Sequence, residues 1–222
     1  MSGTGDVLLA IDSATTRVVV AAGTRDGTVL DTIDWPAGYR HGETLLPAID
    51  DLLGRLAVER GRLAAIVVGT GPGAFTGLRV GIATAKGIAQ ALDRPLIGVS
   101  TGDALLAGAP DEAVLLLPAG PSDRLVVRRG SPARLVAGDA DAGIGSGTVV
   151  LALDLSGRAP EDALARGEAA RSDLGASLVR LGAARLAAGE ADDLARLVPD
   201  YVTLPRGVRS EAGEVSWSHD RR

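Results

Sequence analysis

The stretch that decides the fold runs from Gly69 to Gly81 and reads GTGPGAFTGLRVG. An apolar run at residues 65–68 precedes it and is typical of a buried strand, and residues 80–92 follow with the composition of a helix. A strand, a glycine-rich turn and a helix N-terminus in this order present unpaired backbone N–H groups that can bind an anion. The stretch is not a Walker A loop, which ends in Gly-Lys-Ser/Thr, and its glycine spacing is not that of the dinucleotide fingerprint.

Four residues within this turn have distinct physical roles. Gly71 and Gly73 lack a Cβ, so they can adopt positive φ or lie tightly against a neighbour. Pro72 stiffens the turn between them, and Thr76 is a candidate N-cap for the helix. We therefore expect a well-defined turn that determines how the helix is presented.

The regions on either side of the turn predict the layout of a first lobe. Strands are expected at residues 7–11, 17–22, 28–34, 66–69 and 96–99, and helices at residues 43–60 and 80–92. The first three strands can form an antiparallel meander, and strands separated by helices add to it in parallel. This is the ribonuclease-H-like layout, so the sequence predicts an α/β, actin-like, two-lobed fold with helices on a mixed sheet.

The second half of the chain gives weaker signals. Short strands are expected at residues 113–117, 125–128, 133–136 and 149–153. A helix is expected at residues 172–188, with Ser172 as its N-cap. The chain thus divides into an N-terminal lobe at 1–107, a smaller, degenerate C-terminal α/β lobe at 108–204, and a polar tail at 205–222 that we expect to be disordered.

The composition excludes several classes of protein. The formal net charge is −5 and aromatic residues make up 2% of the 222 residues, which disfavours a nucleic-acid-binding module. The chain has no cysteine, which excludes disulfides, thiolate nucleophiles and cysteine metal sites and is compatible with a cytoplasmic location. No apolar run is long enough to cross a bilayer and no secretory signal pattern is present, so we expect no membrane partner.

The residue types that carry chemistry are sparse. His41 and His219 are the only histidines and lie far apart in the sequence, so we expect no metal site. Ser13 and Ser100 have no histidine near them in sequence, and no triad signature is present. We therefore assign no catalytic residue.

Several segments together carry a family resemblance. They read LAIDSAT at residues 9–15, HGETLLP at 41–47, GPGAFTGLRVG at 71–81 and PLIGVS at 95–100, with AAGEA at 187–191 and PDYV at 199–202. With these segments the chain resembles the TsaB (YeaZ) family, strongly over about residues 6–105 and more loosely towards the C-terminus. Residues 118–124 depart from the family, which usually carries an Asp-Ala-Arg-like stretch there that leads to a tyrosine.

The resemblance implies an actin-like fold without a catalytic role of its own. TsaB-like proteins resemble degenerate copies of their partner TsaD, which transfers a threonylcarbamoyl group to tRNA adenosine in t6A biosynthesis. The implied role is that of a partner that activates TsaD, together with the ATPase TsaE, and that also pairs with itself as a homodimer. Contact with tRNA is then expected only through the assembled complex. No cofactor of its own is implied, and ATP or ADP with Mg is expected only at the interface with partners.

A nucleotide or anion turn is the first candidate site. Its residues are Asp12, Thr15, Gly71, Gly73, Thr76 and Arg79. Active members of the actin-like superfamily typically have glycine two residues after the aspartate, whereas this chain has Ala14, whose methyl group would crowd a phosphate. Arg79 lies in the first turn of a helix, where a cation is disfavoured, so we expect Glu43 or a ligand phosphate to compensate it. A plain turn and an active ATPase or small-molecule kinase remain the two alternatives at this site.

A partner interface is the second candidate site. It would be formed by the helices at 43–60 and 76–92, through Glu43, Leu45, Leu46, Ile49, Leu53, Gly77, Val80, Gly81 and Thr84. The leucines cover more than a narrow stripe, and Gly77 and Gly81 lie one turn apart on a face of small residues. The alternatives are an exposed apolar patch for a partner and tight packing on this protein's own sheet.

Overall fold

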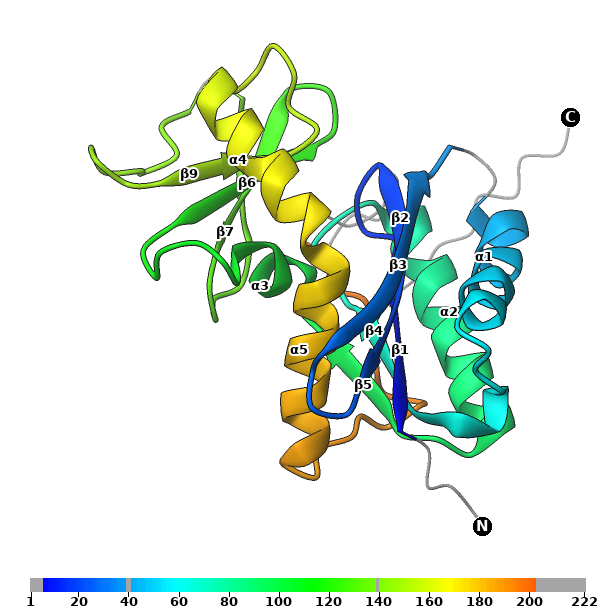
Figure 1. Ribbon diagram of the computed structural model, residues 1–222. Helices are drawn as coiled ribbons and strands as arrows, with labels where there is room; N and C mark the ends of the chain where they lie inside the picture. Colours follow the sequence, from blue (N-terminus) through cyan, green and yellow to red (C-terminus); the bar gives the residue numbers. More distant parts are fainter. Residues whose placement is uncertain (1–5, 39–40, 139, 203–222) are drawn as a thin grey trace, which may run out of the picture.

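The computed structural model describes residues 6–38, 41–138 and 140–202 (Figure 1). The predicted tail at 205–222, with His219, lies outside the described residues. The elements are β1 (Val7–Asp12), β2 (Arg17–Thr24), β3 (Val29–Pro36), α1 (His41–Arg55), the 3₁₀ turn η1 (Arg60–Arg62), β4 (Leu63–Gly69), α2 (Phe75–Leu92), β5 (Leu96–Val99), α3 (Thr101–Leu106), β6 (Val114–Ala119), β7 (Asp123–Arg128), β8 (Arg134–Val136), β9 (Val150–Ala152), α4 (Glu161–Ser172) and α5 (Leu174–Ala187).

The first sheet has the predicted mixed topology. Its strand order is β3-β2-β1-β4-β5, with antiparallel pairing in the β1–β2–β3 meander and parallel pairing of β4 with β1 and of β5 with β4. Helices α1 and α2 cover one face and α5 covers the other (Figure 1). Every residue of β1 and β4 is buried, as expected for central strands covered on both faces.

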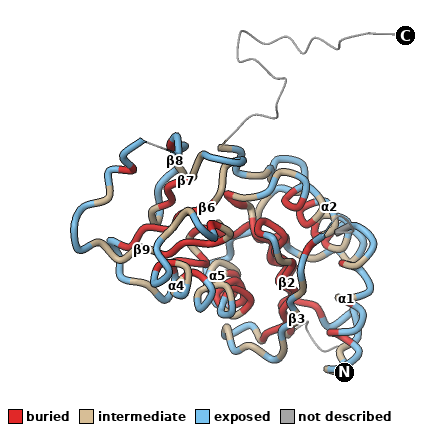
Figure 2. Tube along the Cα trace, turned by 90° about the horizontal axis from the view of Figure 1, so that it is seen from above, coloured by how far each residue is buried: buried red, intermediate tan, exposed pale blue. Residues whose placement is uncertain are grey.

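Side chains of β1 alternate between two hydrophobic clusters. Leu9 and Ile11 join the cluster beneath α1 and α2, whereas Leu8 and Ala10 join the cluster beneath α5. Figure 2 shows buried chain at β2 and in α5, and exposed chain on the outer surface of α1. The sheet is thus the middle of three layers.

The second sheet is smaller, with the order β8-β7-β6-β9, and α4 packs on β9. Helix α4 was not predicted, because its buried residues are only Ala163 and Gly167 and it has no apolar stripe. Gly167 lies directly on β9: a Cβ there would be 2.7 Å from the Ala152 carbonyl carbon, closer than real Cβ atoms come. Close backbone approach replaces side-chain burial at this contact.

Helices α4 and α5 follow each other almost without a break and connect the two sheets (Figure 1). The predicted N-cap, Ser172, is instead the last residue of α4, and α5 begins at Leu174. Helix α5 packs on β1 and β2 of the first sheet. The last part of the predicted 108–204 lobe therefore lies with the first sheet, because the chain returns to cover that sheet's open face.

One further boundary differs from the sequence prediction. Helix α1 ends at Arg55 rather than at residue 60, because the chain turns at Ala57 with φ of 51°.

After α5, the segment 190–202 runs along the free edge of β5. Asp192 N–H donates to the Leu96 carbonyl at 2.8 Å, and Gly98 N–H donates to Asp192 Oδ2 at 2.7 Å. This segment covers an edge strand that would otherwise expose unpaired backbone groups. No helix of the described part of the chain is both long and apolar enough to span a membrane.

The contrast between two helical glycines gives a test of the α4 contact. Gly167→Ala should lower the free energy of unfolding by about 2 kcal/mol or more, because its methyl group collides with backbone that cannot rotate away. Gly87→Ala is the matched control: Gly87 lies inside α2 with open space around its Cβ position, so this substitution should stabilise by about 0.5–1 kcal/mol. Urea unfolding of both variants measures the difference, and equal effects would contradict the packing described for α4.

Candidate functional site

Asp12 is the centre of a buried hydrogen-bond cluster at the carboxyl end of the first sheet. Its side chain is 0% exposed; Oδ1 accepts from Ala14 N–H at 2.8 Å and Oδ2 accepts from the Thr101 hydroxyl at 2.6 Å. Thr101 Oγ1 in turn accepts from Gly71 N–H at 3.1 Å. Burial raises the pKa of Asp12 to about 6, against the opposing effect of these hydrogen bonds. The cluster joins the ends of β1 and β4 to the start of α3.

The two predicted nucleotide loops pack directly against each other. Ala74 N–H donates to the Ala14 carbonyl at 2.6 Å, and a Cβ on Gly73 would lie 2.7 Å from the Ala14 Cβ. Gly73 therefore serves close contact between two loops of this protein. With Gly71 N–H also bonded to Thr101, two of the backbone donors expected for an anion are already used.

The remaining residues of the predicted turn have local roles. Thr15 is 5% exposed and its hydroxyl donates to the Arg17 carbonyl at 3.1 Å, as part of the β1–β2 turn. Thr76 is not the N-cap, because α2 begins at Phe75 after Ala74, which offers no side-chain cap. Gly71 has φ of 107° and precedes Pro72 through a cis peptide bond.

Arg79 meets aromatic rings rather than the predicted Glu43. Its guanidinium carbon lies 3.7 Å from the centroid of the Phe75 ring, and its Nε donates to the Tyr201 hydroxyl at 2.9 Å. The Phe75 and Tyr201 rings are 5.0 Å apart. A cation at the start of α2 is thus stabilised by π faces and a hydroxyl acceptor. The motif around Tyr201 was visible in the sequence, but its partner was not, since 122 residues separate it from Arg79.

A cleft of about 550 Å³ separates the loops of the two sheets. Ala14, Gly73 and Phe75 line one side of it, and the divergent stretch around Gly120 and Ser122 lines the other. Asp12 does not line the cleft. Aspartate is the residue type most often used to bind Mg-nucleotide in such a cleft, but the Asp12 side chain is fully buried and does not reach the cleft surface.

An ion pair that the sequence did not reveal lies at one end of this cleft, and a hydrogen bond from Thr16 connects it to the first lobe. Asp154 Oδ1 accepts from Arg171 Nη1 at 2.8 Å and from the Thr16 hydroxyl at 2.7 Å. The Arg171 and Asp154 side chains are only 9% and 13% exposed. Thr16 belongs to the β1–β2 turn, Asp154 follows β9 and Arg171 lies in the last turn of α4, so no local pattern could have linked them.

The predicted interface helices form a shallow apolar groove, which we call the α1–α2 groove. It has a volume of about 350 Å³ and is lined by Leu46, Ile49, Asp50, Leu53, Arg60, Gly87, Ile88, Ala91 and Leu92, with Leu9 and Leu63 below. Leu46 is 53% exposed, whereas Leu45, Ile49 and Leu53 are almost fully buried in the core. Ile88 and Leu92 line the groove but are not among the predicted interface residues, although they follow Thr84 at helical spacing.

The other predicted interface residues divide between the surface and the interior. Glu43 is exposed, and Val80 and Thr84 are half-buried. Gly77 and Gly81 face inward: the Ser13 hydroxyl donates to the Gly77 carbonyl at 2.7 Å, and a Cβ on Gly81 would collide with Ser13 Oγ. For these two glycines the alternative of packing within the protein is the one observed.

No group of three or more acidic or histidine side chains that could hold a metal occurs among residues 6–38, 41–138 and 140–202.

Comparison with known proteins gives consistent matches. A family model described as TsaD, tRNA N6-adenosine threonylcarbamoyltransferase, matches residues 36–198. The chain is similar to the tRNA threonylcarbamoyladenosine biosynthesis protein TsaB of Escherichia coli (strain K12), with 38% identity over 102 residues, which is 46% of this chain and 43% of that protein. The protein of the same description from Bacillus subtilis (strain 168) is 33% identical over 100 residues, which is 45% of this chain and 43% of the relative. The aligned stretch thus spans less than half the length of either relative.

Among solved structures, YeaZ from Pseudomonas aeruginosa superposes with a TM-score of 0.68 at 24% identity, covering 89% of this chain and 100% of that chain. This likeness, together with the family model, confirms the predicted actin-like α/β fold.

The raised pKa of Asp12 gives a test of its structural role. Because the folded protein favours protonated Asp12, wild-type stability contributed by this group is lost as the pH rises from about 4 through about 6. Asp12→Asn cannot ionise, so its free energy of unfolding relative to wild type should rise by roughly 2–3 kcal/mol between pH 4 and pH 7. Urea unfolding across this range measures the difference, and a flat difference would contradict the assignment.

Proposed function

Because the chain belongs to the family of TsaD, tRNA N6-adenosine threonylcarbamoyltransferase, and within it to the TsaB family, we propose that it is a non-catalytic subunit of t6A biosynthesis. In this role it binds and activates TsaD, with TsaE as a further partner, in threonylcarbamoyl transfer to tRNA adenosine. The complex acts in the cytoplasm, and tRNA meets this chain only through the assembled complex.

The observation that carries the proposal is the α1–α2 groove. Leu46, on its rim, is more than half exposed, and the apolar floor continues to Ile88 and Leu92. A contiguous apolar surface of this kind is the usual mark of a protein–protein interface. Asp50 and Arg60 at its edge, which form an ion pair at 2.8 Å, supply the polar rim that such interfaces have.

The packing of the two loops supports the non-catalytic part of the proposal. Phosphate binding would need space between the Ala14 turn and the Gly73 turn, and these turns are hydrogen-bonded to each other. Asp12 and Thr15, which would hold Mg-nucleotide in an active ATPase or kinase, are buried and bonded to other groups of this chain. ATP or ADP with Mg therefore belongs, in this proposal, to the interface with partners.

The groove also accounts for the proposed homodimer. One apolar surface can pair with a second copy of this chain when TsaD is absent and with TsaD when it is present, so the two assemblies compete for the same residues. Self-association of the isolated chain should then decrease as TsaD is added.

A matched pair of leucines tests the docking surface. Leu46→Asp should weaken binding to TsaD at least about tenfold, because it places a charge in the apolar contact. Leu135→Asp is the control: Leu135 is similarly exposed, at 45%, but lies on β8 of the second sheet. Calorimetric titration of each variant with TsaD measures the affinities, and thermal unfolding of each variant checks the fold. Equal affinities for wild type and Leu46→Asp would refute this docking surface. Gly81 is unsuitable for the test, because any side chain there disturbs Ser13.

Activity assays test the non-catalytic role. We expect the chain alone to show no ATP hydrolysis or phosphoryl transfer with Mg²⁺, and to raise the rate of t6A formation when it is added to TsaD and TsaE. Turnover of ATP by the isolated chain at an enzyme-like rate would favour the ATPase or kinase alternative instead.

A further inference from the structure

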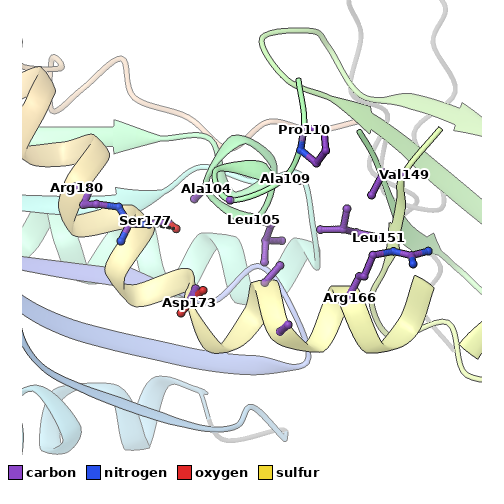
Figure 3. Close-up of a pocket in the computed structure, with 13 residues that line it drawn as sticks. Ala104, Leu105, Ala109, Pro110, Val149, Leu151, Arg166, Asp173, Ser177 and Arg180 are labelled. Atoms are coloured by element: carbon purple, nitrogen blue, oxygen red, sulfur yellow. Dashed lines mark hydrogen bonds between the residues drawn. The ribbon is translucent and has the colours of Figure 1, made fainter. Parts of the chain in front are cut away.

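A separate cavity of about 260 Å³ lies at the joint between α4 and α5 (Figure 3). We call it the joint cavity. Its walls come from α4 and α5 on one side, and from α3, the loop at 108–110 and the β9 region on the other. It shares no lining residue with the cleft or with the α1–α2 groove, so it is a distinct feature of the molecule.

Three polar side chains gather at one end of the joint cavity. Asp173, Ser177 and Arg180 are spaced i, i+4 and i+7 along the helix, which places them on the same face. Ser177 is 2% exposed, and its Oγ accepts from Arg180 Nη2 at 3.1 Å. The Arg180 guanidinium therefore reaches back along the helix towards the cavity, as Figure 3 shows.

These groups have hydrogen-bonding capacity that the described part of the chain does not use. Among the described residues, no group accepts the Ser177 hydroxyl proton and no carboxylate pairs with Arg180. Within the same set, the Asp173 carboxylate has no hydrogen-bond or ion-pair partner. A cation, a hydroxyl donor and an anion thus lie together at the mouth of one cavity.

The other end of the joint cavity is apolar. Leu105, Val149 and Leu151 form its wall opposite the helix. Arg166 also lines the cavity, but its guanidinium is engaged elsewhere: Nε donates to the Val150 carbonyl at 2.7 Å and Nη2 to Asp162 at 2.8 Å. Its charge is therefore already compensated.

We propose that the joint cavity binds a small aliphatic α-amino acid in its zwitterionic form. The carboxylate of the ligand bonds to Arg180 and to the Ser177 hydroxyl, its ammonium group bonds to Asp173, and its side chain packs against Leu105 and Leu151. A zwitterion is the class that matches both charges: a simple carboxylate would leave Asp173 facing it, and a simple amine would leave Arg180 unpaired. The volume of about 260 Å³ lies at the small end of the range for ligand sites, which fits an amino acid better than a nucleotide. This site goes beyond the proposed function and does not depend on it, since the residues that line the cavity belong to this chain.

Calorimetric titration of the full chain with free amino acids tests the proposal. L-Valine and L-leucine should bind with dissociation constants in the micromolar to millimolar range, whereas isovalerate and isobutylamine, each lacking one charge, should bind at least about tenfold more weakly. Arg180→Gln and Asp173→Asn should each weaken L-valine binding at least about tenfold. Arg196→Gln and Glu112→Gln are the matched controls, because both residues are exposed and lie outside the cavity, and they should leave binding unchanged.

A cavity-filling variant gives a second test. Ala170→Met should abolish binding by occupying the apolar end, and thermal unfolding without ligand verifies that each variant is folded. Three results would overturn the proposal: no binding of either amino acid at millimolar concentrations, equal binding of isovalerate and L-valine, or unchanged binding in both the Arg180 and Asp173 variants. Since the titration uses the isolated chain, its failure leaves the TsaD-binding proposal untouched, and failure of TsaD binding leaves this site untouched.

Discussion

The buried carboxylate of Asp12 is the constraint on which the rest of the structure depends. A carboxyl group that is 0% exposed must have its oxygens hydrogen-bonded, and Ala14 N–H and the Thr101 hydroxyl meet that need. Because Thr101 also accepts from Gly71 N–H, one cluster fixes the turn after β1, the turn after β4 and the start of α3. The close contact of the Ala14 and Gly73 turns follows from this arrangement.

In our proposal, that contact is the reason why the actin-like framework is kept although its cleft binds no nucleotide. The glycines of the turn, which in sequence look suited to a phosphate, allow two loops of the same chain to touch. The outer face of α1 and α2 then carries the exposed apolar surface, including Leu46. In our proposal, the function of the chain has moved from the cleft between the lobes to this outer face.

The α4–α5 pair connects the two sheets through close helix packing and an interlobe hydrogen bond. Helix α4 lies on β9 through Gly167, α5 lies on the first sheet, and Arg171 at the end of α4 joins Asp154 and Thr16 across the lobes. The joint cavity lies on the inner side of this pair (Figure 3). A ligand there would contact elements of both lobes, which would connect occupancy of the cavity with the relative position of the lobes.

The sequence by itself determined the five strands of the first sheet and helices α1 and α2, because these segments carry strong apolar periodicity and their turn residues leave few alternatives. It did not reveal α4, whose contact uses Ala163 and Gly167 and leaves no apolar stripe. The sequence also could not decide whether Gly77 and Gly81 face a partner protein or pack against Ser13. It did not show that Arg79 contacts Tyr201. It did not show that Arg171 forms an ion pair with Asp154. Such contacts join residues that are far apart in the chain, and only the tertiary structure decides which side chains meet. A local sequence pattern shows how residues are spaced along one helix or strand. It does not show which other helix, strand or loop packs against that element.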